Sequence, residues 1–96
     1  LAAELEGADG VQTRVVAADL GETSGPARVL DAIADLEIDV FVNNAGLGYA
    51  GRFDKLEPER VRNLVEVNCV APVVLAAGVL PGMRERGRGA MIVSGS

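Results

Sequence analysis

The sequence has 96 residues, of which 49% are hydrophobic and 3% aromatic, with a formal net charge of -5 and an isoelectric point near 4.6. This length allows one small domain or part of one, since independent domains most often have about 100 to 150 residues. The acidic balance argues against a nucleic-acid partner, which requires a basic surface. The absence of histidine excludes Ser-His-Asp triads and His-based zinc sites within these residues.

The predicted elements alternate between helices and strands. In chain order they are the tail of a helix at 1–6, a strand at 13–18, a helix that begins near Pro26 after a cap at Thr23 or Ser24, a strand at 38–42, a long helix from Pro58 to about Arg86, and a strand at 90–93. Strand, helix, strand, helix, strand is the order of βαβ units, so we predict an α/β fold with a parallel sheet. Because the chain begins inside a helix and stops at the last strand, we expect it to be an internal part of a longer domain.

Polar residues follow each of the predicted strands. Asp19 follows the first, Asn43 and Asn44 follow the second, and residues 94–96 (SGS) follow the third. Any one of them alone is more often a turn former or a helix cap. Because ligands of open parallel sheets bind outside the carboxyl ends of the strands, the three together predict a binding site at this edge.

Gly46, Gly48 and Gly51 match the GxGxxG pattern of dinucleotide-binding loops. That loop must open a helix, whereas residues 52–57 separate Gly51 from the next predicted helix. We therefore interpret the match as accidental and expect a flexible loop in which Gly46 lets the backbone approach a flat ligand. Tyr49 on this loop either contacts substrate or covers apolar surface.

Asn68 falls where the apolar stripe of the long helix predicts an aliphatic residue. Pro72 lies four residues later, has no N–H group, and its ring collides with the carbonyl of Asn68, which predicts a kink there. The freed carbonyl can bind water or a ligand group; the alternative is a satisfied core asparagine beside a tolerated proline kink. Cys69 is expected to be a small buried hydrophobe.

Three further features bear on location and partners. A single cysteine cannot form an internal disulfide, which fits a reducing, cytoplasmic compartment. The longest apolar run, residues 70–83, contains two prolines and is shorter than the roughly 20 residues that span a bilayer, so we expect no membrane partner. Arg84, Arg86 and Arg88 form a basic cluster, which we interpret as cations favoured at a helix C-terminus.

Four motifs give the sequence a resemblance to a known family. They are VAADL at 16–20, NNAG at 43–46, VNCVAP at 67–72 and GRGAMIVSGS at 87–96. In this order and spacing they resemble the short-chain dehydrogenases/reductases, and the resemblance covers essentially the whole chain. It implies the central part of a Rossmann-like, doubly wound parallel sheet, with residues 1–96 a partial NAD(P)-binding domain.

The resemblance also implies roles for individual residues. Asp19 matches the acid that contacts the adenine ring, with Leu20 contributing its backbone. Asn43, Ala45 and Gly46, with Asn44 beside them, match the segment along the adenosine ribose. Asn68 matches the helix-kink asparagine whose carbonyl holds a water in the proton relay, and Ser96 matches the serine that hydrogen-bonds the substrate oxygen. No metal site is implied.

The expected function is hydride transfer between NAD or NADP and a small-molecule carbonyl or alcohol. The family's TGxxxGxG turn and YxxxK pair are absent from these residues, so we expect the fragment alone to be inactive. The alternative is a noncatalytic or truncated Rossmann-like binding or dimerisation module. The apolar second half of the helix at 58–86 favours a homo-oligomer through that helix or, equally, a well-buried helix.

Overall fold

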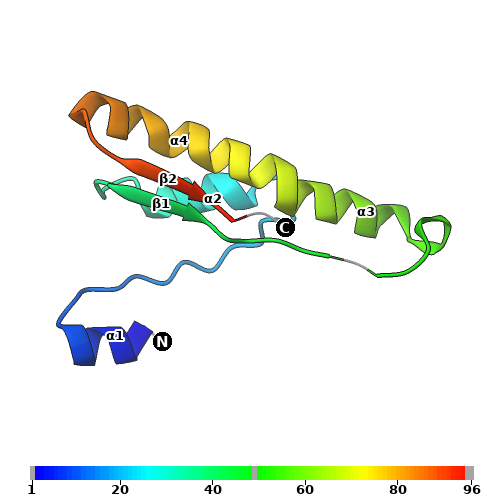
Figure 1. Cartoon of the computed structure of the whole chain (residues 1–96), viewed down its shortest axis with the longest axis horizontal. Coiled ribbons are helices and arrows are strands. Elements are labelled where there is room, and N and C mark those ends of the chain that lie inside the picture. The colour runs from blue at the N-terminus through cyan, green and yellow to red at the C-terminus, as the bar shows by residue number, and fades with distance from the viewer. Residues whose placement is uncertain (1, 49, 95–96) are drawn as a thin grey trace.

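The computed structural model describes residues 2–48 and 50–94 (Figure 1). Its elements in chain order are α1 (Ala2–Asp9), α2 (Gly25–Ala32), β1 (Val40–Asn43), the 3₁₀ turn η1 (Phe53–Lys55), α3 (Pro58–Val65), the π-helical turn η2 (Glu66–Val70), α4 (Ala71–Arg86) and β2 (Ala90–Val93). Ser96 and Tyr49, which the sequence singled out, lie outside the described residues.

β1 and β2 form a parallel pair in which Val40 lies opposite Ala90 and Asn43 opposite Val93. The predicted strand at 90–93 is confirmed with its bounds, and the parallel pairing is confirmed as well. The predicted strand at 38–42 begins and ends later in the chain than expected. Its pairing starts beside Ala90, whose N–H donates to the carbonyl oxygen of Asp39 over 2.9 Å. β1 therefore ends on Asn43 itself.

The prediction of a strand at 13–18 is wrong. This segment is extended but joins no sheet among the described residues, and Val15 within it is 81% exposed (Figure 1). A strand requires a neighbour to take its backbone N–H and C=O groups, and no described segment lies alongside to do so. α1 sits beyond this segment, apart from the sheet.

The predicted long helix is continuous over residues 58–86 but changes its geometry in the middle. Pro72 has no N–H group to donate to the carbonyl of Asn68. The chain accommodates this with the wider turn η2, at whose end the N–H of Ala71 donates to the carbonyl of Glu66. The sequence predicted an irregularity at Asn68, and the structure shows it as a π-helical turn, a form common at functional sites.

The helix ends as expected at Gly87, whose φ of 71° is a left-handed conformation that glycine adopts without a Cβ clash. The N–H of Arg88 then donates to the carbonyl of Met83 over 3.1 Å, which closes the last turn. The chain reverses here and enters β2.

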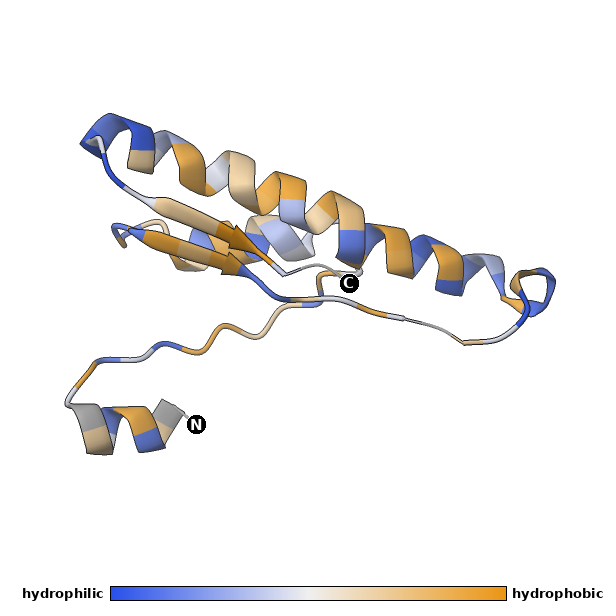
Figure 2. Cartoon of the chain, viewed as in Figure 1, coloured by the Kyte–Doolittle hydropathy of each residue, from blue (hydrophilic) through white to orange (hydrophobic). Residues whose placement is uncertain are grey.

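One row of apolar side chains forms the core. Its members recur every fourth residue along the helix and face the sheet and α2: Val67, Ala71, Leu75, Val79 and Met83. α2 packs closely on α4, since a Cβ added to Gly78 would lie 2.5 Å from Cδ1 of Leu30. Figure 2 shows apolar residues along both strands and along much of α4. Cys69 lies off the row and is exposed, so its prediction as a buried hydrophobe is wrong.

The helix over 58–86 has 29 residues and is long and apolar enough to cross a bilayer by length and composition alone. The expectation of no membrane span rested on the apolar run at 70–83, whereas the helix itself has the predicted extent of 58–86. A core helix of a globular domain passes the same test, and α4 here packs against α2 and β1.

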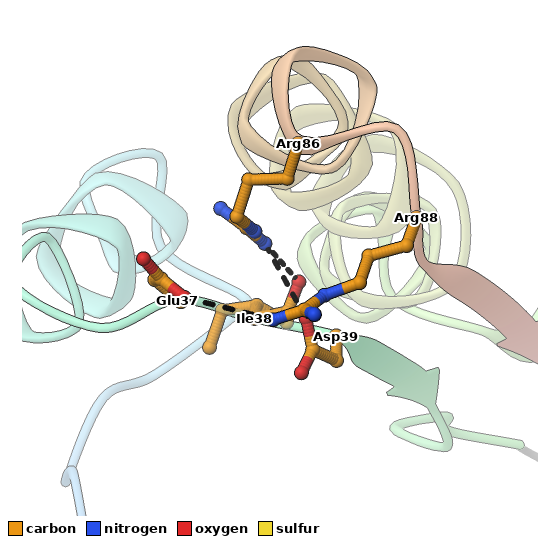
Figure 3. Close-up of polar contacts among 5 residues, drawn as sticks. All are labelled: Glu37, Ile38, Asp39, Arg86 and Arg88. Atoms are coloured by element: carbon orange, nitrogen blue, oxygen red, sulfur yellow. Dashed lines mark hydrogen bonds and ion pairs between the residues drawn. The ribbon is translucent and has the colours of Figure 1, made fainter.

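Two arginines join the end of α4 to the start of β1 (Figure 3). Arg86 donates from Nη2 to the carbonyl oxygen of Ile38 over 2.6 Å and lies 3.9 Å from the carboxylate of Asp39. Arg88 donates from Nε to Oδ1 of Asp39 over 3.3 Å and forms an ion pair with Glu37. Arg84 and Arg86 lie in the last turn of α4, where the basic cluster was predicted to be.

Candidate functional site

A cavity of about 520 Å³ opens at the carboxyl ends of β1 and β2. The strand ends, the loop after β1 and the η2 region surround it, and its lining residues are Asn43, Asn44, Ala45, Gly46, Leu47, Gly48, Asn68, Pro72, Val93 and Ser94. The structure thus brings together five of the predicted site residues, namely Asn43, Asn44, Ala45, Gly46 and Asn68.

Among the described residues, Asn43 is the one polar residue that is buried, with 7% of its surface exposed. It is the last residue of β1, and its carbonyl accepts a hydrogen bond from the N–H of Ser94 over 2.8 Å. This bond extends the β1–β2 ladder by one step. Asn43 and Ser94 therefore sit side by side where the two strands end.

Asn68 is tied to the opposite wall of the cavity. Its Oδ1 accepts from the N–H of Leu47 over 2.8 Å, and its Nδ2 donates to the carbonyl of Leu47 over 2.7 Å. The prediction placed Asn68 on the core stripe, but the residue is exposed, since the buried row runs through Val67 and Ala71 instead. Its amide is satisfied by loop backbone rather than by core groups.

Gly46 lies where the loop passes Asn68. A Cβ built on Gly46 would lie 3.5 Å from Oδ1 of Asn68, which is ordinary van der Waals contact. Glycine at this place therefore leaves open space on the cavity wall. The glycine pattern as a whole does not open a helix, because Gly51 is followed by η1 and α3 begins only at Pro58.

Asp19 and Leu20 are not among the residues that line the cavity. They lie in the turn before α2, where Oδ1 of Asp19 accepts from the N–H of Gly21 over 2.9 Å. This turn is close to α3, since a Cβ on Gly21 would lie 1.8 Å from Oδ1 of Asn63. The sequence placed Asp19 on the same sheet edge as Asn43, but among the described residues the segment at 13–18 pairs with no strand that would carry Asp19 to that edge.

Four lining residues were not singled out as site residues: Leu47, Gly48, Pro72 and Val93. Leu47 carried a usable signal, because it is an apolar residue between two glycines in the loop after β1. Val93 carried none, since a valine at the end of a strand is ordinary.

The described lining contains amides, one hydroxyl and apolar groups, with no ionisable side chain. It is suited to hydrogen bonds with neutral polar groups such as hydroxyls and carboxamides. No group of His, Cys, Asp or Glu side chains among the described residues is arranged to hold a metal ion.

The sequence model of the short chain dehydrogenase family matches residues 1–96. Among curated relatives, human (Homo sapiens) 17-beta-hydroxysteroid dehydrogenase type 1 is 33% identical over 78 residues, covering 81% of this chain and 24% of that protein. Retinol dehydrogenase 8 of Bos taurus is 36% identical over 86 residues, covering 88% of this chain and 28% of that protein.

Solved structures agree. The alcohol dehydrogenase of Comamonas testosteroni specific for bulky-bulky ketones superposes with a TM-score of 0.91 at 32% identity, covering 99% of this chain and 39% of that one. L-sorbose reductase of Gluconobacter frateurii, in complex with NADPH and L-sorbose, gives 0.87 at 34% identity, covering 96% and 36%.

These likenesses confirm the predicted fold class, a Rossmann-like, doubly wound parallel sheet of which this chain forms a part. The chain spans about a quarter of the length of the curated relatives it matches. The family model nevertheless covers every residue. The chain belongs to the short-chain dehydrogenase family.

Proposed function

We propose that these residues are the central part of an NAD(P)-dependent oxidoreductase domain that transfers hydride between nicotinamide and a carbonyl or alcohol substrate. The observation that carries the proposal is the cavity at the carboxyl ends of β1 and β2, where Asn43, Asn44, Gly46 and Asn68 line one space. In open parallel sheets this is where ligands bind. The nicotinamide supplies the hydride chemistry when bound.

In this proposal Asn43, Ala45 and Gly46 lie along the adenosine ribose, with Asn44 beside them. The ribose offers hydroxyl groups, which the amides of the lining can bind, and the missing side chain of Gly46 leaves room for the sugar. Asp19 and Leu20 are proposed to contact the adenine from the turn before α2. That role requires the turn at 19–21 to lie at the edge of the cavity in the complete domain.

Asn68 is proposed to act through its backbone carbonyl. Because Pro72 has no N–H group to occupy that oxygen, it is available to a water molecule that passes a proton to the reacting end of the site. The side-chain amide meanwhile holds the loop at Leu47. Ser96 is proposed to hydrogen-bond the substrate oxygen.

Either NADP or NAD is the proposed cofactor. The short-chain dehydrogenase of Sphingobium yanoikuyae in complex with NADPH gives a TM-score of 0.91 at 32% identity, which supports a nicotinamide cofactor. The residues that choose between the two cofactors follow the family's second strand, and the resemblance places that strand before Leu1.

The proposed partners are a small-molecule carbonyl or alcohol and a second copy of the chain, in the cytoplasm and without nucleic acid or membrane. Val73 on α4 is 68% exposed and Leu80 is 50% exposed, which favours an interface along this helix. The same exposure favours the alternative function, a noncatalytic binding or dimerisation module. The net charge of -5 supports the absence of nucleic acid.

The test uses a full-length protein that contains these residues. It is titrated with NADPH and, separately, with NADH, and binding is measured by cofactor fluorescence. We expect binding by the wild type and about tenfold weaker binding by Gly46→Ala, whose methyl group fits the fold but occupies the cavity, a loss of about 1.4 kcal/mol. Gly7→Ala is the matched control, since nothing lies within 4 Å of a Cβ there.

A wild type that binds neither cofactor would overturn the proposal. Binding without oxidation of either cofactor in the presence of ketones would favour the noncatalytic alternative. A polypeptide of residues 1–96 alone is expected to transfer no hydride, because it contains no YxxxK pair.

A further inference from the structure

Leu47 has an unusual place in the cavity wall. It is the largest apolar side chain in the lining, it is 40% exposed, and its neighbours Gly46 and Gly48 have no side chains. Leucine is one of the residues most often buried in folded proteins. Among residues 46–48, Leu47 is the one whose side chain can contact a ligand.

The backbone of Leu47 is fixed at both of its polar groups. Its N–H donates to Oδ1 of Asn68 over 2.8 Å and its carbonyl accepts from Nδ2 of the same amide over 2.7 Å. Two hydrogen bonds to one planar amide set the orientation of the Leu47 peptide groups as well as their distance. The side chain of Leu47 is thereby presented from a pre-organised backbone, the property that a selective contact requires.

The lining differs in chemistry between its parts. The strand ends contribute Asn43, Asn44 and Ser94, which suit the hydroxyls of a sugar. Leu47 and Pro72 contribute apolar surface, and both are close to Asn68, the first through its hydrogen bonds and the second one helical turn along the chain. The proposed function places the reacting end of the site beside Asn68.

We propose that Leu47 is a specificity-determining residue, whose side chain contacts the apolar part of the carbonyl or alcohol substrate and limits its bulk. This inference rests on the proposed function. Its physical basis is that each methylene gained or lost in an apolar pocket changes selectivity by about tenfold or more. The side chain of Leu47 would then contact the substrate and not the ribose of the cofactor, so its truncation would change substrate selectivity and not cofactor affinity.

The test compares Leu47→Ala with the wild type in a full-length protein, using acetophenone and benzophenone as probes with NADPH. Truncation enlarges the apolar part of the cavity, so kcat/KM for benzophenone relative to acetophenone should rise about tenfold or more, while the Kd for NADPH stays within about twofold. Leu36→Ala is the matched control, because Leu36 is 43% exposed and lies outside this lining.

A second measurement covers the case in which neither probe is reduced. With ¹³C-methyl-labelled leucine, the Leu47 resonances, assigned from their loss in Leu47→Ala, should shift when acetophenone is added to the NADP complex. Unchanged selectivity, or Leu47 resonances that respond to NADP and not to the ketone, would overturn the inference while leaving the proposed function intact. A wild type that binds no cofactor would refute both.

Discussion

The side-chain amide of Asn68 forms a hydrogen bond with each polar backbone group of Leu47, at 2.8 and 2.7 Å. A residue on the long helix thereby fixes the loop that follows β1. Asn68 lies in the π-helical turn just before Pro72, so the irregular part of the helix and the residue that holds the loop coincide. The wall of the cavity is built from this connection.

Asn68→Ala is expected to remove both bonds to Leu47. Each bond contributes about 1 kcal/mol net, and the site is open to water, so the free energy of unfolding should fall by about 1 to 2 kcal/mol. Urea unfolding measures this loss, and an NADPH titration should show weaker binding. Arg28→Ala on α2, an exposed position outside the helix at 58–86, is the control and should change stability by less than about 0.5 kcal/mol. Equal losses in the two variants would show that the tie to Leu47 carries no energy.

Gly78→Ala is expected to separate α2 from α4. Its Cβ would lie 2.5 Å from Cδ1 of Leu30 and 2.6 Å from Cδ2, so Leu30 must move out of its packed position. Overpacking of this kind costs about 1 to 3 kcal/mol, of which about 1 kcal/mol is offset because alanine is the better helix former, so thermal unfolding should record a modestly lower Tm. The double variant Gly78→Ala, Leu30→Ala should recover part of the loss, because the clashing atoms are removed; no recovery would contradict the contact.

Arg86 and Arg88 are expected to differ in their effects although both pair with Asp39. Arg86 is 23% exposed in its side chain and donates to the carbonyl of Ile38 over 2.6 Å, so Arg86→Ala should cost about 1 to 2 kcal/mol. Arg88 is 66% exposed, and its loss should cost no more than about 1 kcal/mol. Chemical denaturation of both variants measures the difference.

Salt supplies the control for this pair. The effect of Arg88→Ala should shrink in 1 M NaCl, where the screening length is about 3 Å, whereas that of Arg86→Ala should persist. The bond from Arg86 to Ile38 is a contact with a neutral carbonyl and is less easily screened. If both effects disappear in salt, Arg86 acts as a surface charge only.

Asp35 is expected to make stability depend on acid pH. The hydrogen bond from Arg14 lowers the pKa of the Asp35 carboxyl below its ordinary value of 3.8. A lowered folded-state pKa contributes stability above the unfolded pKa, and this contribution is lost as pH falls below about 3.8 toward the folded-state pKa. The Tm difference between wild type and Asp35→Asn should therefore narrow between pH 5 and pH 2.

Arg14→Gln completes a double-mutant cycle with Asp35→Asn, since each variant breaks the ion pair between Arg14 and Asp35. Arg14 also donates to the carbonyl oxygen of Ala32 over 2.9 Å, so the double variant Arg14→Gln, Asp35→Asn should be about as stable as Arg14→Gln alone. Both side chains are exposed, at 45% and 66%, so the effect is small and falls with added salt. A Tm difference that is independent of pH would show that the Asp35 carboxyl has the same pKa in the folded and the unfolded protein.

The sequence by itself determined the class of fold, the strand at 90–93, the parallel partner at its side, the irregularity at Asn68 and most of the polar edge at 43–46. These features follow from local chemistry: aliphatic runs that need burial, a proline that has no donor, and glycines that end a helix. The sequence also carried the family resemblance, which the comparison over residues 1–96 confirmed.

Only the tertiary structure decided the rest. The segment at 13–18 has the composition of a strand, but strand formation depends on a neighbour that supplies hydrogen bonds, and composition does not reveal one. Cys69 was expected inside and is exposed, because it lies off the buried row that starts at Val67 and Ala71. The bond between Asn68 and Leu47 joins residues 21 apart in the chain, and the cavity wall at Leu47 exists because the fold brings those two backbones together.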